Sequence, residues 1–285
     1  LFSCGFVVIG SLIMHRQSGI SPSKVFLPQG GNAHATVLDF LVDKFPAIPS
    51  DEWASRFNDG LIFDADGLTL SVTSQYLAGT FVYYFRRVES EEQIPFKEAI
   101  LYQDDHLLIA DKPHFLPVTP GGHYLHETLL VRLKKSTGIE ALSPIHRIDR
   151  ETAGLVAFSK RPEDRNAYQA LFREQSVLKR YEAIAPYRGD LSDRFPIHYS
   201  SRIEESEVFI QMHEVSGEPN SDSLINVLET KGAWAKYSLK LGTGKKHQLR
   251  VHMSALGADP KAPSEYLASK GEGEALVMAA QGDLD

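Results

Sequence analysis

The stretch PIHRIDRETAGL, residues 144–155, places a single carboxylate among arginines and then a glycine before an apolar run. Asp149 lies between Arg147 and Arg150, and nearby cations favour the ionised form of a carboxyl group. An ionised aspartate can serve as a nucleophile or a base, and Gly154 would let another backbone approach closely. The apolar residues that follow predict a strand. Taken alone, the spacing favours a surface turn held by ion pairs over a catalytic site.

A second stretch, GTGKKHQLRVHM at residues 242–253, is densely basic. As a helix it would place His247 and Arg250 on one face, with Met253 toward the core. A Walker phosphate loop needs a glycine where Leu239 stands, so that site is excluded. The histidines lack the H-E-x-x-H frame and a nearby carboxylate. A metal-dependent hydrolase is therefore disfavoured and stays only as an alternative.

Composition limits the class of protein. The 285 residues are 42% hydrophobic and 24% charged, which is typical of a globular protein with one large domain, or a medium and a small one. The single cysteine, Cys4, excludes an intrachain disulfide and predicts a reducing compartment, the cytoplasm. The net charge of −7 argues mildly against nucleic acid. However, residues 231–252 hold six Lys or Arg and no carboxylate, and a local basic strip can bind RNA phosphates.

Four segments follow from composition and periodicity. Residues 1–31 predict an extended or disordered arm, whose apolar start is too short to span a bilayer and lacks signal-peptide features, so no membrane partner is expected. Residues 32–90 predict a small unit, and a charged linker leads from it to a larger domain at 95–260. Residues 261–285 form an acidic tail that we expect to be poorly ordered and dispensable. The expected elements are helices at 36–45, 52–58, 166–174 and 248–256, and strands at 80–85, 100–102, 107–110, 155–158, 181–185 and 234–241.

Four motifs in one order carry a resemblance to a known family. HRIDRETAG (146–154) resembles the HRLD-x-x-TSG motif of RluA-type pseudouridine synthases, and GKKHQLRVHM (244–253) resembles their G-R-x-H-Q-L/I-R-x-H motif. LLIADKPHFLPVTP (107–120) and KRYEA (179–183) are similar to two further segments of that family. Details of the first and third of these stretches resemble the branch that acts on both transfer RNA and 23S ribosomal RNA. The amino-terminal unit weakly resembles the alpha-L RNA-binding motif. The resemblance implies an α+β catalytic domain on a mixed, largely antiparallel sheet, preceded by that small unit.

The resemblance also implies a reaction and its residues. The expected activity is isomerisation of specific uridines to pseudouridine in ribosomal or transfer RNA, with base flipping, no cofactor and a monomeric enzyme. Asp149 falls on the catalytic aspartate, Tyr181 on the tyrosine that packs on the base and is a candidate for the final proton removal, and Arg250 on the arginine that pairs with the aspartate. Arg147 falls on the residue that enters the RNA stack. Further RNA contacts are expected from Arg150, Lys179, Lys245, Lys246 and His247.

Three departures from the family pattern leave an alternative open. Ile148 and Ala153 replace the commoner Leu and Ser, which are mild changes. Lys245 stands where arginine is usual, which keeps the charge but loses the planar fork. After the last motif the family continues with Gly-x-Pro-Ile and Asp-x-x-Tyr, whereas this sequence has GADP at 257–260 and then the acidic tail. The alternative is a non-catalytic RNA-binding homologue with a truncated carboxyl end.

Overall fold

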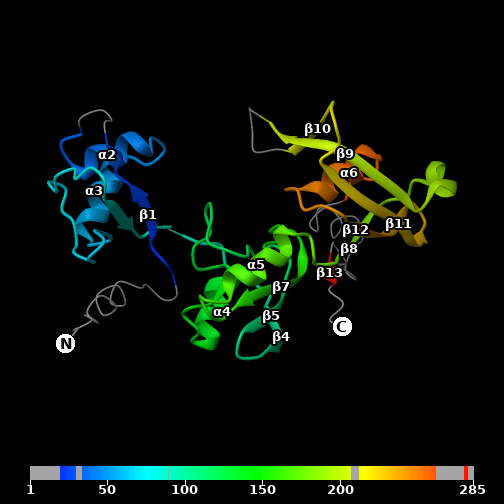
Figure 1. Ribbon diagram of the computed structural model, residues 1–285, viewed down its shortest axis with the longest axis horizontal. Helices are drawn as coiled ribbons and strands as arrows, with labels where there is room; N and C mark the ends of the chain where they lie inside the picture. The colour runs from blue at the N-terminus through cyan, green and yellow to red at the C-terminus, as the bar shows by residue number, and fades with distance from the viewer. Residues whose placement is uncertain (1–19, 30–33, 89, 207–211, 261–278, 282–285) are drawn as a thin grey trace. The chain divides into compact units, whose positions relative to one another are not determined.

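The computed structural model describes residues 20–29, 34–88, 90–206, 212–260 and 279–281 (Figure 1). The chain divides into two compact units, Leu1–Glu91 and Glu92–Asp285. Each unit has a hydrophobic core of its own. None of the described helices is long and apolar enough to cross a membrane.

The first unit packs two helices against a small antiparallel sheet. Its elements are β1 (Ser23–Phe26), α2 (Val37–Lys44), α3 (Ser50–Asn58), β2 (Ile62–Phe63) and β3 (Phe81–Tyr84), with the strands in the order β1-β3-β2. Both predicted helices are confirmed. Thr36 begins α2 with a capping box, in which its hydroxyl accepts from Asp39 N at 3.1 Å and its own N donates to the Asp39 carboxylate at 3.0 Å.

Part of the predicted amino-terminal arm belongs to this unit. β1 pairs with β3 along its whole length, and Val25 and Leu27 are buried in the core. Composition alone predicted a free arm here. Backbone pairing and the alternate apolar side chains instead hold these residues in the first unit. The rest of the predicted arm, residues 1–19 and 30–31, lies outside the described residues.

The second unit is built on one large sheet. Its strands run in the order β10-β9-β11-β12-β8-β13-β7-β5-β4, with β6 paired to β7, and every pairing is antiparallel except β13 with β7. The expected mixed, largely antiparallel sheet is confirmed. The strands are β4 (Ala99–Gln103), β5 (Leu107–Lys112), β6 (Ser143–Pro144), β7 (Ala153–Ser159), β8 (Lys179–Pro186), β9 (Ile197–Glu205), β10 (Met212–Val215), β11 (Ser221–Lys231), β12 (Trp234–Leu241) and β13 (Ala279–Gln281); the helices are α4 (Leu129–Thr137), α5 (Arg165–Arg173), the 3-10 helix η1 (Gly189–Arg194) and α6 (Gln248–Ala255).

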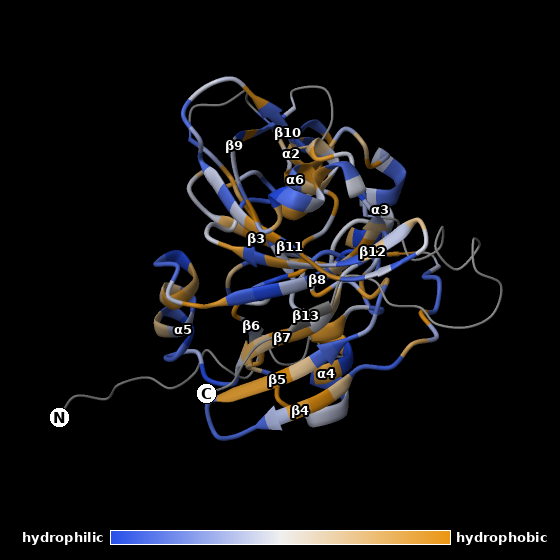
Figure 2. Ribbon diagram, turned by 90° about the vertical axis from the view of Figure 1, so that its right-hand side faces the viewer, coloured by the Kyte–Doolittle hydropathy of each residue, from blue (hydrophilic) through white to orange (hydrophobic). Residues whose placement is uncertain are grey.

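Two hydrophobic cores lie in different halves of this sheet. One gathers around β5, β7 and α4, with Val156 and Phe158 at 0% exposure, and Figure 2 shows the apolar residues of β5 beside β4. The other gathers around β8, β12 and α6, and includes Tyr237, Leu239 and Met253. Strand β13 lies between β7 and β8, where the two halves meet.

The expectation that every residue after Pro260 is poorly ordered is wrong for β13. Ala279 and Ala280 pair with Ala153 and Gly154 of β7, and Ala280 and Gln281 pair with β8. A strand with a neighbour on each side forms backbone hydrogen bonds on both edges, which offsets an ordering cost that composition alone judged too large. Residues 261–278 and 282–285 lie outside the described residues.

Candidate active site

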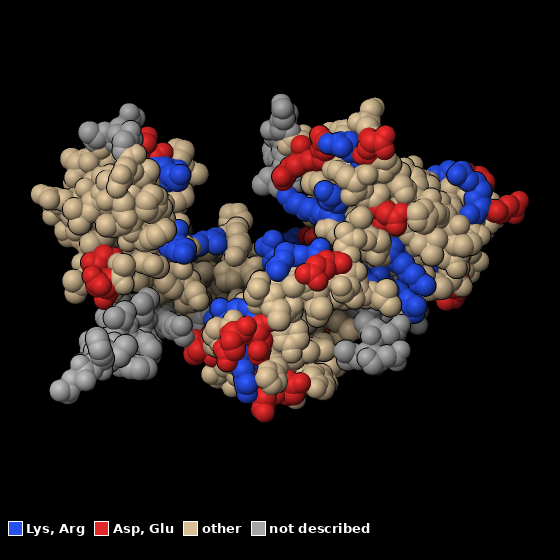
Figure 3. All heavy atoms as spheres, in the orientation of Figure 1, with Lys and Arg blue, Asp and Glu red and all other residues tan. Residues whose placement is uncertain are grey.

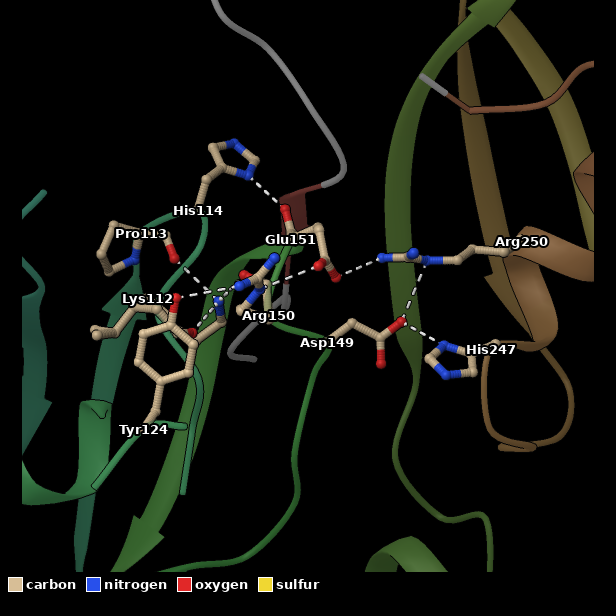
Figure 4. A network of polar contacts seen from close by, with 10 residues as sticks. Lys112, Pro113, His114, Tyr124, Asp149, Arg150, Glu151, His247 and Arg250 are labelled. Carbon is tan, nitrogen blue, oxygen red and sulfur yellow. Dashed lines mark hydrogen bonds and ion pairs between the residues drawn. The ribbon is translucent and has the colours of Figure 1, made fainter. Parts of the chain in front are cut away.

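Asp149 lies in the loop between β6 and β7. Its carboxylate faces Arg250 of α6 and His247, the residue just before α6 (Figure 4). His247 Nδ1 is 2.8 Å from Asp149 Oδ2, and Arg250 Nε is 3.3 Å from the same oxygen. The two stretches singled out in the sequence therefore meet in space. Gly154, the second residue of β7, has φ 118°, a backbone conformation that favours glycine.

Arg250 bridges two carboxylates. Its Nη2 donates to Glu151 Oε2 at 3.0 Å, while its Nε faces Asp149. Burial raises the pKa of Glu151, but a backbone hydrogen bond, the charge of Arg250 and hydrogen bonds from Arg250 and Arg150 together lower it by more, so the net pKa is below its usual value. Glu151 is therefore ionised at neutral pH, and the guanidinium is held in place from two sides.

Lys112 and His114 hold the backbone of the loop that carries Asp149. The Lys112 ammonium donates to the carbonyl oxygens of Pro113 at 2.9 Å, Leu116 at 2.8 Å and Arg150 at 3.1 Å. Its side chain is fully buried, and burial lowers its pKa to about 7. His114 Nδ1 donates to the carbonyl oxygen of Glu151 at 2.7 Å. Two successive carbonyls beside Asp149 are thus fixed by side chains that end or follow β5 (Figure 4).

The turn before α6 is held by one buried amide. Gln248 is 2% exposed, and its Oε1 accepts from Thr243 Oγ1 at 2.7 Å and from Lys245 N at 3.0 Å. Its Nε2 donates to Asp222 O at 2.7 Å and to Ser223 Oγ at 3.0 Å. All four hydrogen-bonding positions of the amide are used, so the turn that carries His247 and Arg250 is rigidly anchored.

Tyr181 lies on β8, where it pairs with Leu239 of β12 and Ala280 of β13. Burial raises its pKa to about 12, and the negative charge of Asp149 contributes to the rise. A phenol with this pKa is protonated at neutral pH. Before it could accept a proton from a substrate, it would have to give up its own.

The six residues predicted to contact RNA lie on three segments that contact one another: the loop of Asp149, the start of β8 and the turn before α6. Arg147 is exposed, two residues before Asp149. Arg150 turns to Tyr124, whose hydroxyl accepts its Nη1 at 3.2 Å. Lys179 Nζ is 3.4 Å from Thr243 O, and burial lowers its pKa. Lys246 pairs with Glu205 at 2.8 Å, and Lys245 lies in the anchored turn. The sixth, His247, is partly exposed, and its Nδ1 faces Asp149.

The basic strip at 231–252 is partly neutralised within the unit. Lys236 pairs with Glu182 at 2.7 Å, Lys246 pairs with Glu205, and Arg250 pairs with Asp149 and Glu151. On the face shown in Figure 3, Lys and Arg gather near α5, whereas Asp and Glu gather near β10. Half of the strip therefore has carboxylate partners inside the protein before any RNA arrives.

Four residues of the site had no assigned role in the sequence: Lys112, His114, Glu151 and Gln248. Lys112 gives the clearest signal, because a lysine that closes the apolar strand LLIAD must find partners for its charge if it is buried. The described residues contain no group of three or more His, Cys, Asp or Glu side chains arranged to hold a metal ion.

Comparisons with known proteins bear on what this arrangement does. The sequence model of the RNA pseudouridylate synthase family matches residues 106–255, which include Lys112, Asp149, Tyr181 and Arg250. The chain belongs to this family. It is 30% identical over 225 residues to an uncharacterised RNA pseudouridine synthase of Synechocystis sp., covering 78% of this chain and 76% of that protein. It is 32% identical over 166 residues to ribosomal large subunit pseudouridine synthase D of Pseudomonas aeruginosa, covering 55% of this chain and 50% of that protein.

A solved structure supports the fold of this synthase. Human RNA pseudouridylate synthase domain containing 1 superposes with a TM-score of 0.53 at 21% identity, over 67% of this chain and 79% of that one. The family model and the relatives confirm the RluA-type assignment and the isomerisation of uridine to pseudouridine in RNA. The family match decides against the metal-dependent hydrolase that the histidines had left open.

Proposed function

We propose that this synthase isomerises specific uridines in structured ribosomal or transfer RNA, with Asp149 as the catalytic carboxylate. The observation that carries the proposal is the Asp149 carboxylate held between Arg250 and His247. The RNA classes are suggested by the relatives, which include the ribosomal synthase above and the mitochondrial tRNA pseudouridine(32) synthase of Saccharomyces cerevisiae, 26% identical over 191 residues.

The chemistry fits these residue types. Isomerisation breaks the bond from uracil N1 to the ribose, forms a bond from uracil C5, and moves one proton from C5 to solvent while N1 gains another. No electrons leave the substrate, so the reaction itself calls for no cofactor. Asp149 acts at the ribose while the base is detached, and the Arg250 guanidinium, which stays charged at any working pH, lies beside its carboxylate.

The other roles follow from position. A uridine inside a stack has to be flipped out, at a cost of a few kcal/mol. Arg147 is exposed beside Asp149 and can fill the gap in the stack with its planar group. Tyr181 lies near Asp149 and can hold the extruded ring, and its protonated hydroxyl can exchange a proton with the carboxylate.

The first unit is proposed to contact RNA as well. Phe26 and Phe81 face each other across β1 and β3, are 46% and 39% exposed, and have ring centroids 5.1 Å apart. Lys24 Nζ lies 5.1 Å from the centre of the Phe81 ring. Exposed aromatic rings beside a cation suit an unpaired base next to its phosphate. We further propose that the enzyme works as a monomer in the cytoplasm, where a single cysteine stays reduced.

Mapping pseudouridine in RNA incubated with the purified chain tests the proposed function. Wild type should form pseudouridine, and Asp149→Asn should form none, because the amide keeps the shape and loses the charge. Asp105→Asn, an exposed carboxylate in the β4–β5 turn, is the matched control and should keep full activity. More than about a hundredth of wild-type turnover in Asp149→Asn, roughly 2.7 kcal/mol of barrier, would remove Asp149 from catalysis. An inactive wild type that still binds RNA would favour the non-catalytic homologue.

A further inference from the structure

His247 has an unusual backbone for a residue with a large side chain. It precedes α6 with φ 53° and ψ 18°, in the left-handed region, and is one of three non-glycine residues with positive φ among those the structure describes. Such conformations persist where the surroundings enforce them, and they cluster at functional sites. Here the enforcement comes from Gln248, whose four hydrogen bonds fix the turn on both sides of this residue.

The imidazole is not needed to begin the helix. Val251 N donates to the backbone carbonyl of His247 at 3.1 Å, and the His247 side chain forms no capping hydrogen bond. The left-handed backbone instead aims the ring at Asp149, with Nδ1 at 2.8 Å from Oδ2 (Figure 4). An ionised carboxylate only accepts, so Nδ1 carries the hydrogen and donates.

The two donors share one oxygen of the carboxylate. His247 Nδ1 and Arg250 Nε both face Asp149 Oδ2, whereas Oδ1 has no hydrogen-bond partner among the residues that the structure describes. The Asp149 side chain is 32% exposed, so this second oxygen can be reached by a substrate. A carboxylate fixed at one oxygen cannot rotate away, and its other oxygen keeps one orientation.

We propose that His247 is a positioning residue, which together with Arg250 holds Oδ2 so that Oδ1 is the oxygen presented to the ribose. The proposal rests on the proposed catalytic role of Asp149. It replaces the sequence-based expectation that His247 contacts RNA. A misplacement of about 1 Å at a reacting group can cost about a hundredfold in rate, so the loss of this restraint should appear in kcat.

Two substitutions separate the imidazole from the backbone it sits on. His247→Gly accepts the left-handed conformation without strain and removes the donor. His247→Asn also tolerates this conformation, and its amide nitrogen stands the same number of bonds from the backbone as Nδ1. Gln175→Gly is the matched control, because Gln175 is exposed, has φ 56° after α5, and has no contact with Asp149.

Single-turnover rates and KM for a modified RNA are measured together with the melting temperature. We expect His247→Gly to lower kcat about tenfold to a hundredfold with KM changed less than about twofold and no loss of melting temperature. His247→Asn should recover at least part of kcat, and Gln175→Gly should match wild type. Unchanged kcat in His247→Gly overturns the proposal, as does a raised KM at normal kcat, which would make His247 an RNA contact. An active Asp149→Asn would instead refute the proposed function, so the two failures are distinguishable.

Discussion

Replacing Gln248 with methionine tests how the basic turn is held. Methionine has nearly the same length and volume, so the substitution leaves little cavity and removes the amide alone. Among its four partners, Thr243 Oγ1 keeps a hydrogen bond from Asp222 N at 3.0 Å, and Ser223 Oγ keeps His252 Nδ1 at 2.9 Å. Asp222 O keeps a hydrogen bond from Gly242 N at 3.1 Å, so among the described residues only Lys245 N loses its partner without a replacement.

The cost follows from this one backbone group. A buried polar group left unsatisfied costs about 1–3 kcal/mol, with about 2 kcal/mol as the central value. For a unit of this size each kcal/mol lowers the melting temperature by about 2–4 °C, which gives about 4–8 °C. Thermal unfolding followed by circular dichroism measures it, with Gln103→Met on the exposed strand β4 as the control that should not change. A cost below about 1 kcal/mol would refute the reasoning, because the amide would then not be what anchors the turn.

Four further outcomes are expected. Tyr181→Phe should keep RNA affinity and lose turnover, whereas Tyr181→Ala should lose both; equal turnover of Phe and wild type would end the proton-transfer role. The logarithm of RNA affinity should fall by about 2–3 for each tenfold rise in salt concentration. Each of the three strip lysines without a carboxylate partner among the described residues contributes about 0.7–0.9 to this slope. A flat response would place the strip away from RNA. Burial lowers the pKa of His146 to about 4, so an unfolded chain binds its proton first, and the free energy of unfolding should decrease from pH 6.5 to 4; His146→Gln should show a shallower decrease in denaturant titrations. Deleting residues 279–285 should lower the melting temperature, because β13 pairs on both edges; an unchanged value would return the tail to the dispensable segment that its composition predicted.

The elements with regular apolar patterns could be predicted, and those with polar interiors could not. Trp234–Leu241 alternates cleanly and was predicted to the residue, and the strands around 107–110 and 181–185 were found with short ends. β11 was missed because its buried positions include Ser221 and Ser223, at 2% and 0% exposure. These serines are buried because they hydrogen-bond to His252, a long-range partner that no local pattern shows.

The site divides in the same way. Asp149 and Arg250 could be paired from the family motifs, and their contact is present. The place of His247 could not be predicted, because it depends on a left-handed backbone, and the neighbouring Gln248 holds that turn through Asp222 and Ser223, which are far away in sequence. Lys246 was expected to face RNA, but it pairs with Glu205, from the acidic run that lies far from it in sequence.

The reacting groups lie where the two halves of the large sheet meet. Asp149 and Glu151 precede β7 in one half of the sheet, whereas Arg250 and His247 belong to the half with its own separate core. A slow breathing motion that parts the halves would pull the carboxylate from its cations while both cores stay intact. Turnover should then decline on warming before either core melts, and the amides of β7 and β8 should exchange their hydrogens earlier than those within the cores. A molecule that binds both halves at once restrains their relative motion and so keeps the carboxylate beside its cations.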